Sequence, residues 1–228
     1  MQKSFADVKD QLRKQYNYNP SSKEMKSFER LHKRIFCLCN LIYELSKVDN
    51  DRMLFLSELH SDLVLLLIVG SLGIKKAMSL SIRSAIEDTL RHIYYKDHPI
   101  ELSLLNESDD NKITDKEMFR YMEAHPLYCN RNNFKKMLDQ VNYIYHIESK
   151  RLHSTSINYF SSIKVISDLS RDSKILDEEI KSIIDLTSSL LTLIIIYHNK
   201  VFKEMNSENK ALLLSCIKNQ HKQLIHDL

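Results

Sequence analysis

The sequence predicts an all-α protein, a single-domain helical bundle of about six to eight helices. Its 228 residues include only two glycines and three prolines. Tight turns between strands need glycine, whereas the connections of helical bundles need few glycines. Apolar residues also recur at helical spacing through most of the chain. A chain of this length can bury a substantial core without disulfides or metals.

Helical periodicity divides the chain into segments separated by short polar or glycine-containing breaks. The expected helices cover about residues 1–16, 22–46, 52–69, 74–98, 115–125, 132–153, 174–205 and 210–228. Ser21 or Ser22 can cap the second segment and Thr114 or Asp115 the fifth, because short polar side chains accept hydrogen bonds from a first turn. The fourth segment ends at Pro99, since proline disfavours helical geometry in the residue before it.

Composition also predicts the breaks and the domain limits. Gly70 and Gly73 mark a break or kink between the third and fourth helices. The Ser-rich stretch 154–172 is ambiguous between a loop and a loop that contains a short helix. The other expected turns and loops are 48–51, 106–112 and 206–209. The expected parts of the chain are an N-terminal helical extension at 1–20, a bundle core at 21–205 and a C-terminal helix packed on the core at 206–228.

Charge and cysteine content limit the function classes. A net charge of +3 neither demands nor excludes nucleic acid, because dedicated binders carry a larger basic excess. The four cysteines form no CxxC pair and are typical of small apolar residues in a reducing compartment. The first residues lack the apolar stretch of a signal peptide, and the apolar runs at 63–69 and 190–197 fall short of the roughly 20 residues of a membrane span. We therefore expect a cytoplasmic protein without membrane association.

The fourth helix carries the most informative pattern, a narrow polar stripe that borders its apolar face at about 100° per residue. The stripe comprises Arg83, Glu87, Arg91, Tyr94 and His98. A guanidinium is a permanent cation with a donor fork suited to phosphate, and an imidazole titrates near neutral pH. The same spacing is also typical of a ladder of ion pairs worth about 0.2–0.5 kcal/mol each, with His98 as a cation at the helix end.

A second polar stripe lies on the helix before residue 154. It comprises Asn142, His146, Ser149 and His153, and it again borders an apolar face. If the two helices are neighbours, the arginines and the carboxylate of the first stripe face Ser149 and His153. Such a convergence of charged and titratable groups is typical of a functional site, although each histidine alone is more typical of an ordinary interface.

Most known chemical motifs are absent from the sequence. No HExxH, HxH or paired CxxC pattern occurs, so we expect no metal site. Two glycines leave no room for a P-loop or a dinucleotide fingerprint, and there is no GxSxG nucleophile elbow. We therefore expect no cofactor.

Both stripes fall within short motifs. These are R-S-x-x-E at Arg83, Ser84 and Glu87, continuing to R-x6-H at Arg91 and His98, and Y-x3-S-x2-LH at Tyr145, Ser149, Leu152 and His153. Together the motifs resemble those of the HEPN superfamily of small α-helical bundles, over about residues 30–205. The resemblance implies metal-independent RNA cleavage, often by toxins or anti-phage effectors, in which two protomers join their R-x4–6-H motifs. Carried over, the motif arginine and histidine are Arg91 and His98, and the implied partners are RNA, a second copy of the chain and an antitoxin or other protein.

The hypothesis that follows is an endoribonuclease without a metal. A histidine, His98 or His153, takes the proton from a ribose 2′-hydroxyl, and an arginine stabilises the charge at the phosphorus centre. Glu87 orients the arginine or tunes the histidine. The candidate catalytic residues are Arg83, Glu87, Arg91, His98, Ser149 and His153.

The alternative hypothesis is a non-catalytic helical interaction module, either a homodimer or a subunit of an anti-phage effector complex. The two stripes then form the polar seam of an interface, and the modest net charge favours this reading slightly. A third class, a small-ligand sensor in the bundle core, has no specific support in the sequence.

Overall fold

Helices are the only regular structure in the part of the chain that the structure describes. The structure, a computed structural model, describes residues 2–16, 21–48, 53–107, 113–153, 155 and 173–226. Its eleven helices are α1 (Gln2–Tyr16), α2 (Ser22–Ser46), α3 (Leu54–Leu72), α4 (Lys75–Asp97), α5 (Pro99–Glu107), α6 (Asp115–Ala124), α7 (Phe134–Leu152), α8 (Ser173–Tyr197), α9 (Asn199–Glu204), α10 (Ser207–Ser215) and α11 (Asn219–His226). The predicted all-α class is confirmed, whereas the expected six to eight helices were too few for these residues.

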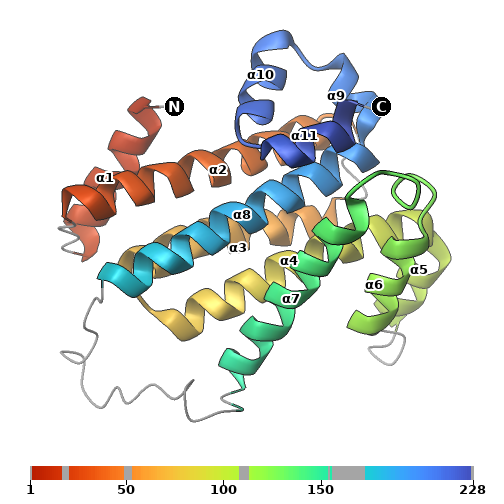
Figure 1. Ribbon diagram of the computed structural model, residues 1–228, viewed down its shortest axis with the longest axis horizontal. Coiled ribbons are helices and arrows are strands. Elements are labelled where there is room, and N and C mark those ends of the chain that lie inside the picture. Colours follow the sequence, from red (N-terminus) through yellow and green to blue (C-terminus); the bar gives the residue numbers. More distant parts are fainter. Residues whose placement is uncertain are drawn as a thin grey trace.

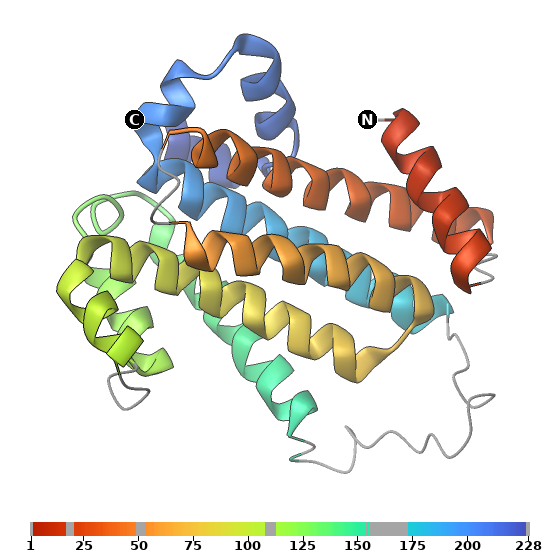
Figure 2. The same cartoon turned by 180° about the vertical axis from the view of Figure 1, so that it is seen from behind.

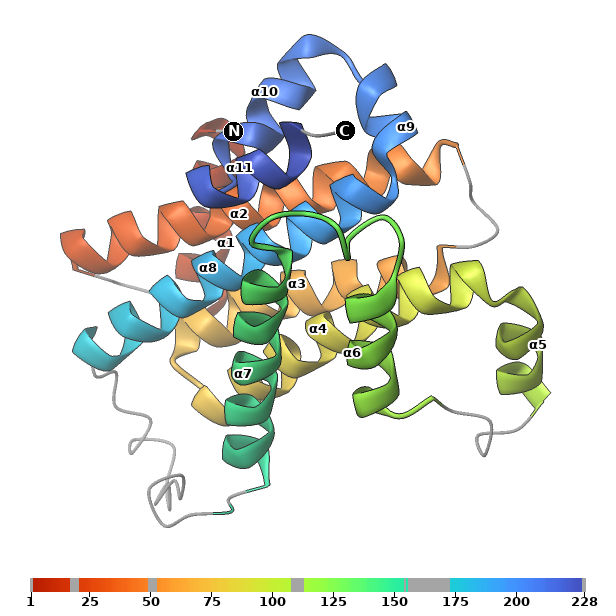
Figure 3. The same cartoon turned by 45° about the vertical axis from the view of Figure 1, so that its right-hand side comes forward.

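Four long helices form the centre of the bundle. α2 contacts α3, α3 contacts α4, α4 contacts α8, and α8 returns to α2, so the four close a ring around the core (Figures 1 and 2). α7 packs outside this ring against α4 and α8. α6 lies beside α7 and also contacts α4, as Figure 3 shows. The outer face of α4 is therefore covered by α6 and α7, which brings three helices together at one place.

Two helices are long and apolar enough to cross a membrane, by length and composition alone. They are the span Leu54–Leu72, which is α3, and the span Glu178–Tyr197, which lies within α8. In the second span 78% of the residues are buried inside the protein, as is typical of a core helix, against 39% in the first. The expected cytoplasmic location stays a prediction.

Helix starts follow the predicted caps. The Ser21 side chain accepts a hydrogen bond from the backbone of Glu24, and the Glu24 side chain accepts one from the backbone of Ser21, which forms a capping box for α2. Thr114 and Glu117 form the same box at the start of α6. Gly73 ends α3 with φ 70°, a left-handed conformation that glycine adopts without strain.

The extra helices arise at three places where a break was expected to be a loop or was not expected at all. Pro99 ends α4 but also begins α5, because proline is well suited to the first position of a helix. The expected long helix 174–205 is interrupted at His198 between α8 and α9. The expected final helix 210–228 is divided, in its described part, into α10 and α11, which begins at Asn219. The expected turn at 206–209 falls at the start of α10, where the Asn206 side chain accepts a hydrogen bond from the backbone of Asn209.

Three of the expected loops fall largely outside the described residues. The structure does not describe 49–51 of the expected turn 48–51, 108–112 of the expected loop 106–112, or the stretch 154–172 apart from residue 155. The C-terminal part of the chain is held to the bundle by contacts of α11 with α8 and of α10 with α2. Buried Cys37 and Cys216 also meet there, with their Sγ atoms 2.9 Å apart as free thiols. The division into 1–20, 21–205 and 206–228 stays a prediction.

Candidate functional site

α4 presents three charged side chains on successive turns toward α6 and α7. Arg83 Nε lies 2.8 Å from Glu87 Oε1, and Arg91 Nη2 lies 3.0 Å from Glu87 Oε2. The carboxylate thus bridges the two guanidiniums, and its side chain is only 13% exposed. Ion pairs at this depth are less screened by solvent than those on an open helix face. The ladder expected from the spacing is present, at the edge of the buried face.

Tyr145 of α7 joins this ladder from the neighbouring helix. Its hydroxyl accepts a hydrogen bond from Arg83 Nε at 3.1 Å and donates to Glu87 Oε1 at 2.9 Å. The same hydroxyl contacts the carboxylate of Asp115, at the start of α6. The Arg83 guanidinium also lies over the tyrosine ring, 5.3 Å from its centre. Burial, together with the bond to Asp115, raises the pKa of Tyr145, so the phenol stays protonated.

His153 supplies the imidazole of the site from the C-terminal end of α7. Its Nε2 lies 3.4 Å from Arg83 Nη1, a long hydrogen bond, while the ring itself is exposed. A guanidinium only donates, so Nε2 is the acceptor and the proton of the neutral ring sits on Nδ1. Arg83 therefore touches both stripes, and we call Arg83, Glu87, Arg91, Asp115, Tyr145 and His153 the Arg83 cluster.

The other members of the second stripe do not join these contacts. The Ser149 hydroxyl donates to the carbonyl of Tyr145 at 2.8 Å, one turn back along its own helix. The exposed ring of His146 meets the edge of the Tyr145 ring, 5.8 Å away between centres. The expectation that Ser149 belongs to the site therefore finds no contact with the arginines among the described residues.

For His98, two expectations were open: its helical angle placed it in the stripe, and its position before Pro99 placed it at the helix end, where the structure has it. The stripe placed it with the arginines, but it lies at the C-terminal cap of α4, where its Nδ1 donates to the carbonyl of Tyr94 at 2.8 Å. Its ring stacks on Tyr94, 4.3 Å between centres, and meets the edge of Tyr121 from α6. Tyr94 in turn donates to Glu101 of α5. Because proline ends the helix just after it, His98 turns toward the cap rather than along the stripe.

A separate polar group lies beside His98, and we call it the Asp97 cluster. It comprises Asp97, Tyr121, His125 and Tyr197. Asp97 Oδ2 accepts hydrogen bonds from Tyr121 at 2.5 Å and from His125 Nε2 at 2.9 Å, and its Oδ1 accepts one from Tyr197 at 2.7 Å. His125 Nδ1 accepts from the backbone of Leu127, so the proton of this ring sits on Nε2. Hydrogen bonds from the two tyrosines and His125 outweigh partial burial and lower the pKa of Asp97.

Two members of the Arg83 cluster were not among the predicted site residues. Tyr145 falls on the apolar face of its helix, and only its place in the Y-x3-S motif singled it out. Asp115 was considered solely as a helix cap, and its distance of 3.8 Å from Arg83 Nη2 depends on how α6 packs against α4. No pattern in the residues around Asp115 predicts its contact with Arg83.

The chemistry open to the Arg83 cluster follows from its charges. Two permanent cations face two carboxylates, Glu87 and Asp115, so the charges balance, and the exposed imidazole of His153 lies beside them. In the described part of the chain, no three His, Cys, Asp or Glu side chains gather closely enough to hold a metal ion. The cluster can therefore present a guanidinium and an imidazole together to an anionic group.

Comparisons with protein-family models, with curated proteins and with solved structures found no match for this chain. The HEPN resemblance therefore depends on the motif residues alone. Of those residues, Arg83, Glu87, Tyr145 and His153 are in mutual contact through Arg83.

Proposed function

We propose that the chain is a metal-independent endoribonuclease of the HEPN type, which cuts RNA at the Arg83 cluster. One observation carries the proposal: the Arg83 guanidinium, a quarter exposed, lies beside the exposed imidazole of His153. A fixed cation next to a proton acceptor is the pair that cleavage of a phosphodiester needs when no metal takes part. RNA is the substrate class, because its 2′-hydroxyl supplies a nucleophile within the strand.

The proposed reaction begins when a phosphodiester approaches Arg83. The phosphate oxygens compete with His153 for the guanidinium, which frees the lone pair on Nε2. His153 then takes the proton of the ribose 2′-hydroxyl, and the 2′-oxygen attacks phosphorus. Arg83 stabilises the charge on the phosphate oxygens as phosphorus becomes five-coordinate. The bond to the 5′-oxygen breaks and that oxygen takes a proton from water. The hydroxide that remains takes the proton from His153, and the RNA ends in a 2′,3′-cyclic phosphate.

The remaining members of the cluster act as positioning residues in this proposal. Glu87 holds Arg83 and Arg91 in register, and Tyr145 fixes Arg83 through its hydroxyl and its ring. Because these groups are held by neighbours on α4, α6 and α7, the guanidinium needs little reorganisation when the phosphate arrives.

The test is RNA cleavage in buffer containing EDTA, with total tRNA as substrate. The wild type should give products ending in 2′,3′-cyclic phosphate. His153→Ala and Arg83→Ala should each lower the rate by about 10²–10⁴-fold, the usual contribution of a positioned proton-transfer group. The matched control is His60→Ala, which removes another exposed imidazole, from α3, and should cleave like the wild type.

Three results would contradict the proposal. They are an inactive wild type, activity that EDTA abolishes, and equal rates for the His153 and His60 variants. In the toxin or anti-phage setting that the resemblance implies, induced synthesis of the wild type should slow growth and the His153 variant should not.

A second candidate function is a non-catalytic interaction module, with the Arg83 cluster as the polar seam of a homodimer or of a contact with another protein. The observation that favours it is the charge balance, because Glu87 and Asp115 already neutralise both arginines. The readout is the molar mass in solution by light scattering. An inactive wild type that forms a dimer, together with a monomeric Arg83→Ala variant, would favour this function over cleavage.

A further inference from the structure

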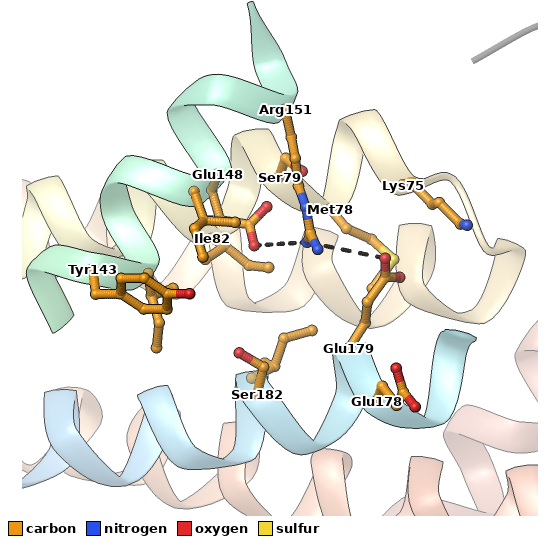
Figure 4. Close-up of a pocket in the computed structure, with 13 residues that line it drawn as sticks. Lys75, Met78, Ser79, Ile82, Tyr143, Glu148, Arg151, Glu178, Glu179 and Ser182 are labelled. Atoms are coloured by element: carbon orange, nitrogen blue, oxygen red, sulfur yellow. Dashed lines mark hydrogen bonds and ion pairs between the residues drawn. The ribbon is translucent and has the colours of Figure 1, made fainter. Parts of the chain in front are cut away.

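A pocket of about 190 Å³ opens between α4, α7 and α8, apart from the Arg83 cluster. Figure 4 shows Arg151 of α7 reaching between two carboxylates, Glu148 on its own helix and Glu179 on α8. Arg151 Nη1 lies 2.9 Å from Glu148 Oε1 and 4.0 Å from Glu179 Oε1. Both carboxylates are therefore held close to one guanidinium nitrogen.

Two of the carboxylates that line the pocket each have one buried oxygen without a hydrogen-bond partner among the described residues. Glu148 is only 4% exposed, and its Oε2 is buried and unpaired. Glu179 Oε2 is in the same situation. Burial raises the pKa of Glu179, even though Arg151 and Lys75 lower it. Buried polar atoms in folded proteins almost always find a partner, so two orphaned acceptors in one pocket call for a donor.

The charge of the pocket selects the kind of donor. Three carboxylates line it, those of Glu148, Glu178 and Glu179, against the two cations Lys75 and Arg151. The missing charge is therefore positive, and an anion would meet two unpaired carboxylate oxygens. A divalent metal ion is not favoured either, because no group of three metal-ligating side chains forms among the described residues. An organic ammonium supplies both the hydrogen-bond donors and the positive charge, since it has three N–H groups and a charge of one.

The rest of the lining is suited to hydrocarbon. Met78, Ile82 and Ile183 line the pocket from α4 and α8. A water molecule in the liquid fills about 30 Å³, so the pocket has room for about six water-sized groups. That is the size of a short aliphatic chain with an amino group at one or both ends.

We propose that this pocket binds a small aliphatic amine, whose ammonium donates to Oε2 of Glu148 and of Glu179 while its hydrocarbon chain lies against Met78, Ile82 and Ile183. The site is separate from the Arg83 cluster, and the proposal does not depend on ribonuclease activity. When the amine binds, its ammonium supplies the hydrogen bonds that the two glutamate oxygens lack, and its charge balances theirs. Bound amine would also join α7 to α8 through a charged contact.

The direct test is isothermal titration calorimetry of the full chain at neutral pH with n-butylamine and with putrescine, a four-carbon diamine. The matched control ligand is 1-butanol, which has the same chain and no charge. We expect saturable binding of at least one amine with one site per chain, and binding of the alcohol at least tenfold weaker. No saturable amine binding at millimolar concentration, or equal binding of amine and alcohol, would overturn the proposal.

Variants locate the site. Glu148→Gln keeps the shape of the side chain and removes its charge, so it should weaken amine binding at least tenfold. Glu179→Gln should do the same, and it serves if the Glu148 variant fails to fold by circular dichroism. The control is Glu123→Gln, an exposed glutamate of α6 outside the pocket, which should bind amine like the wild type. Unchanged affinity in a folded Glu148 or Glu179 variant would place the amine elsewhere and refute the site.

Discussion

The two polar clusters along α4 contain similar side chains but differ in the kind of contact that these side chains make. In the Arg83 cluster, the anions Glu87 and Asp115 face guanidiniums, which are permanent cations and can only donate hydrogen bonds. In the Asp97 cluster, a single carboxylate accepts bonds from two phenols and one neutral imidazole. The first holds charge in place beside an exposed histidine, whereas the second ties α4 to α6 and to the end of α8.

The two clusters also differ in how each contacts a histidine at the end of a helix. His153 and His98 both end a helix and both border a polar stripe. The Nε2 of His153 accepts from a cation that a phosphate could draw away. The Nδ1 of His98 donates to a backbone carbonyl, and its ring stacks on Tyr94 and meets the edge of Tyr121. His98 keeps the lone pair on its Nε2, but its contacts are with tyrosines at the helix cap, whereas His153 lies beside the guanidinium that the proposed cleavage needs.

The largest expected effect comes from removing each histidine in turn. His153→Ala should lower RNA cleavage by about 100-fold or more, with a change in unfolding free energy within about 0.5 kcal/mol, because the ring is exposed. His98→Ala should retain cleavage and lose about 1 kcal/mol of stability, since a cap hydrogen bond and a stacked ring are removed. The measurements are cleavage rates with EDTA and urea unfolding. Equal losses of activity in both variants would remove the distinction between the two clusters.

Local chemistry explains which features could be predicted from the sequence. The capping boxes at Ser21 and Thr114 and the break at Gly73 depend on residues within one turn. Extra breaks, such as the one at His198, depend on how the C-terminal helices pack and have no strong local signal.

The candidate site likewise includes contacts that the sequence predicts and contacts that it does not predict. The contact between Arg83 and His153 was predictable, because both stripes border buried faces that can meet when two helices pack. The roles of Asp115 and Tyr121 were not, since both come from α6, whose position against α4 no periodicity encodes. The helical angle placed His98 in the stripe, whereas its position before Pro99 predicted the helix end, where the backbone decides where its ring points.

The second largest expected effect is on the unfolding free energy. It compares the carboxylate of the Arg83 cluster, Glu87, with that of the Asp97 cluster. Glu87→Gln should lower the unfolding free energy by about 2–3 kcal/mol, because its amide nitrogen would face a guanidinium and neither group can accept a hydrogen bond. Asp97→Asn should lose only about 1 kcal/mol, since the Tyr197 hydroxyl can rotate and accept from the new amide. Urea unfolding at neutral pH measures both. A larger loss for Asp97→Asn would show that the Asp97 cluster, rather than the Arg83 cluster, holds α4 to its neighbours.

The smallest expected effect is a change of stability with pH. It compares Asp97 with a third carboxyl group on α4. Asp88 is buried, and burial together with nearby Asp62 of α3 raises its pKa to about 7. Between about pH 4 and 7, the folded chain therefore keeps a proton that the unfolded chain has released, so this group makes stability fall as the pH rises through that interval. Asp97 has a lowered pKa, so its contribution is full above about pH 4 and is lost only as the pH falls further.

Removing each carboxyl in turn should separate the two pH ranges. Asp88→Asn should be more stable than the wild type by about 1–2 kcal/mol at pH 8, and this advantage should shrink toward pH 5. The difference between Asp97→Asn and the wild type should stay constant from pH 5 to 8 and narrow only below about pH 4. Urea unfolding from pH 3 to 8 measures both differences. An Asp88→Asn curve that runs parallel to that of the wild type would mean that Asp88 is ionised in the folded chain, with Arg91 compensating its charge despite burial.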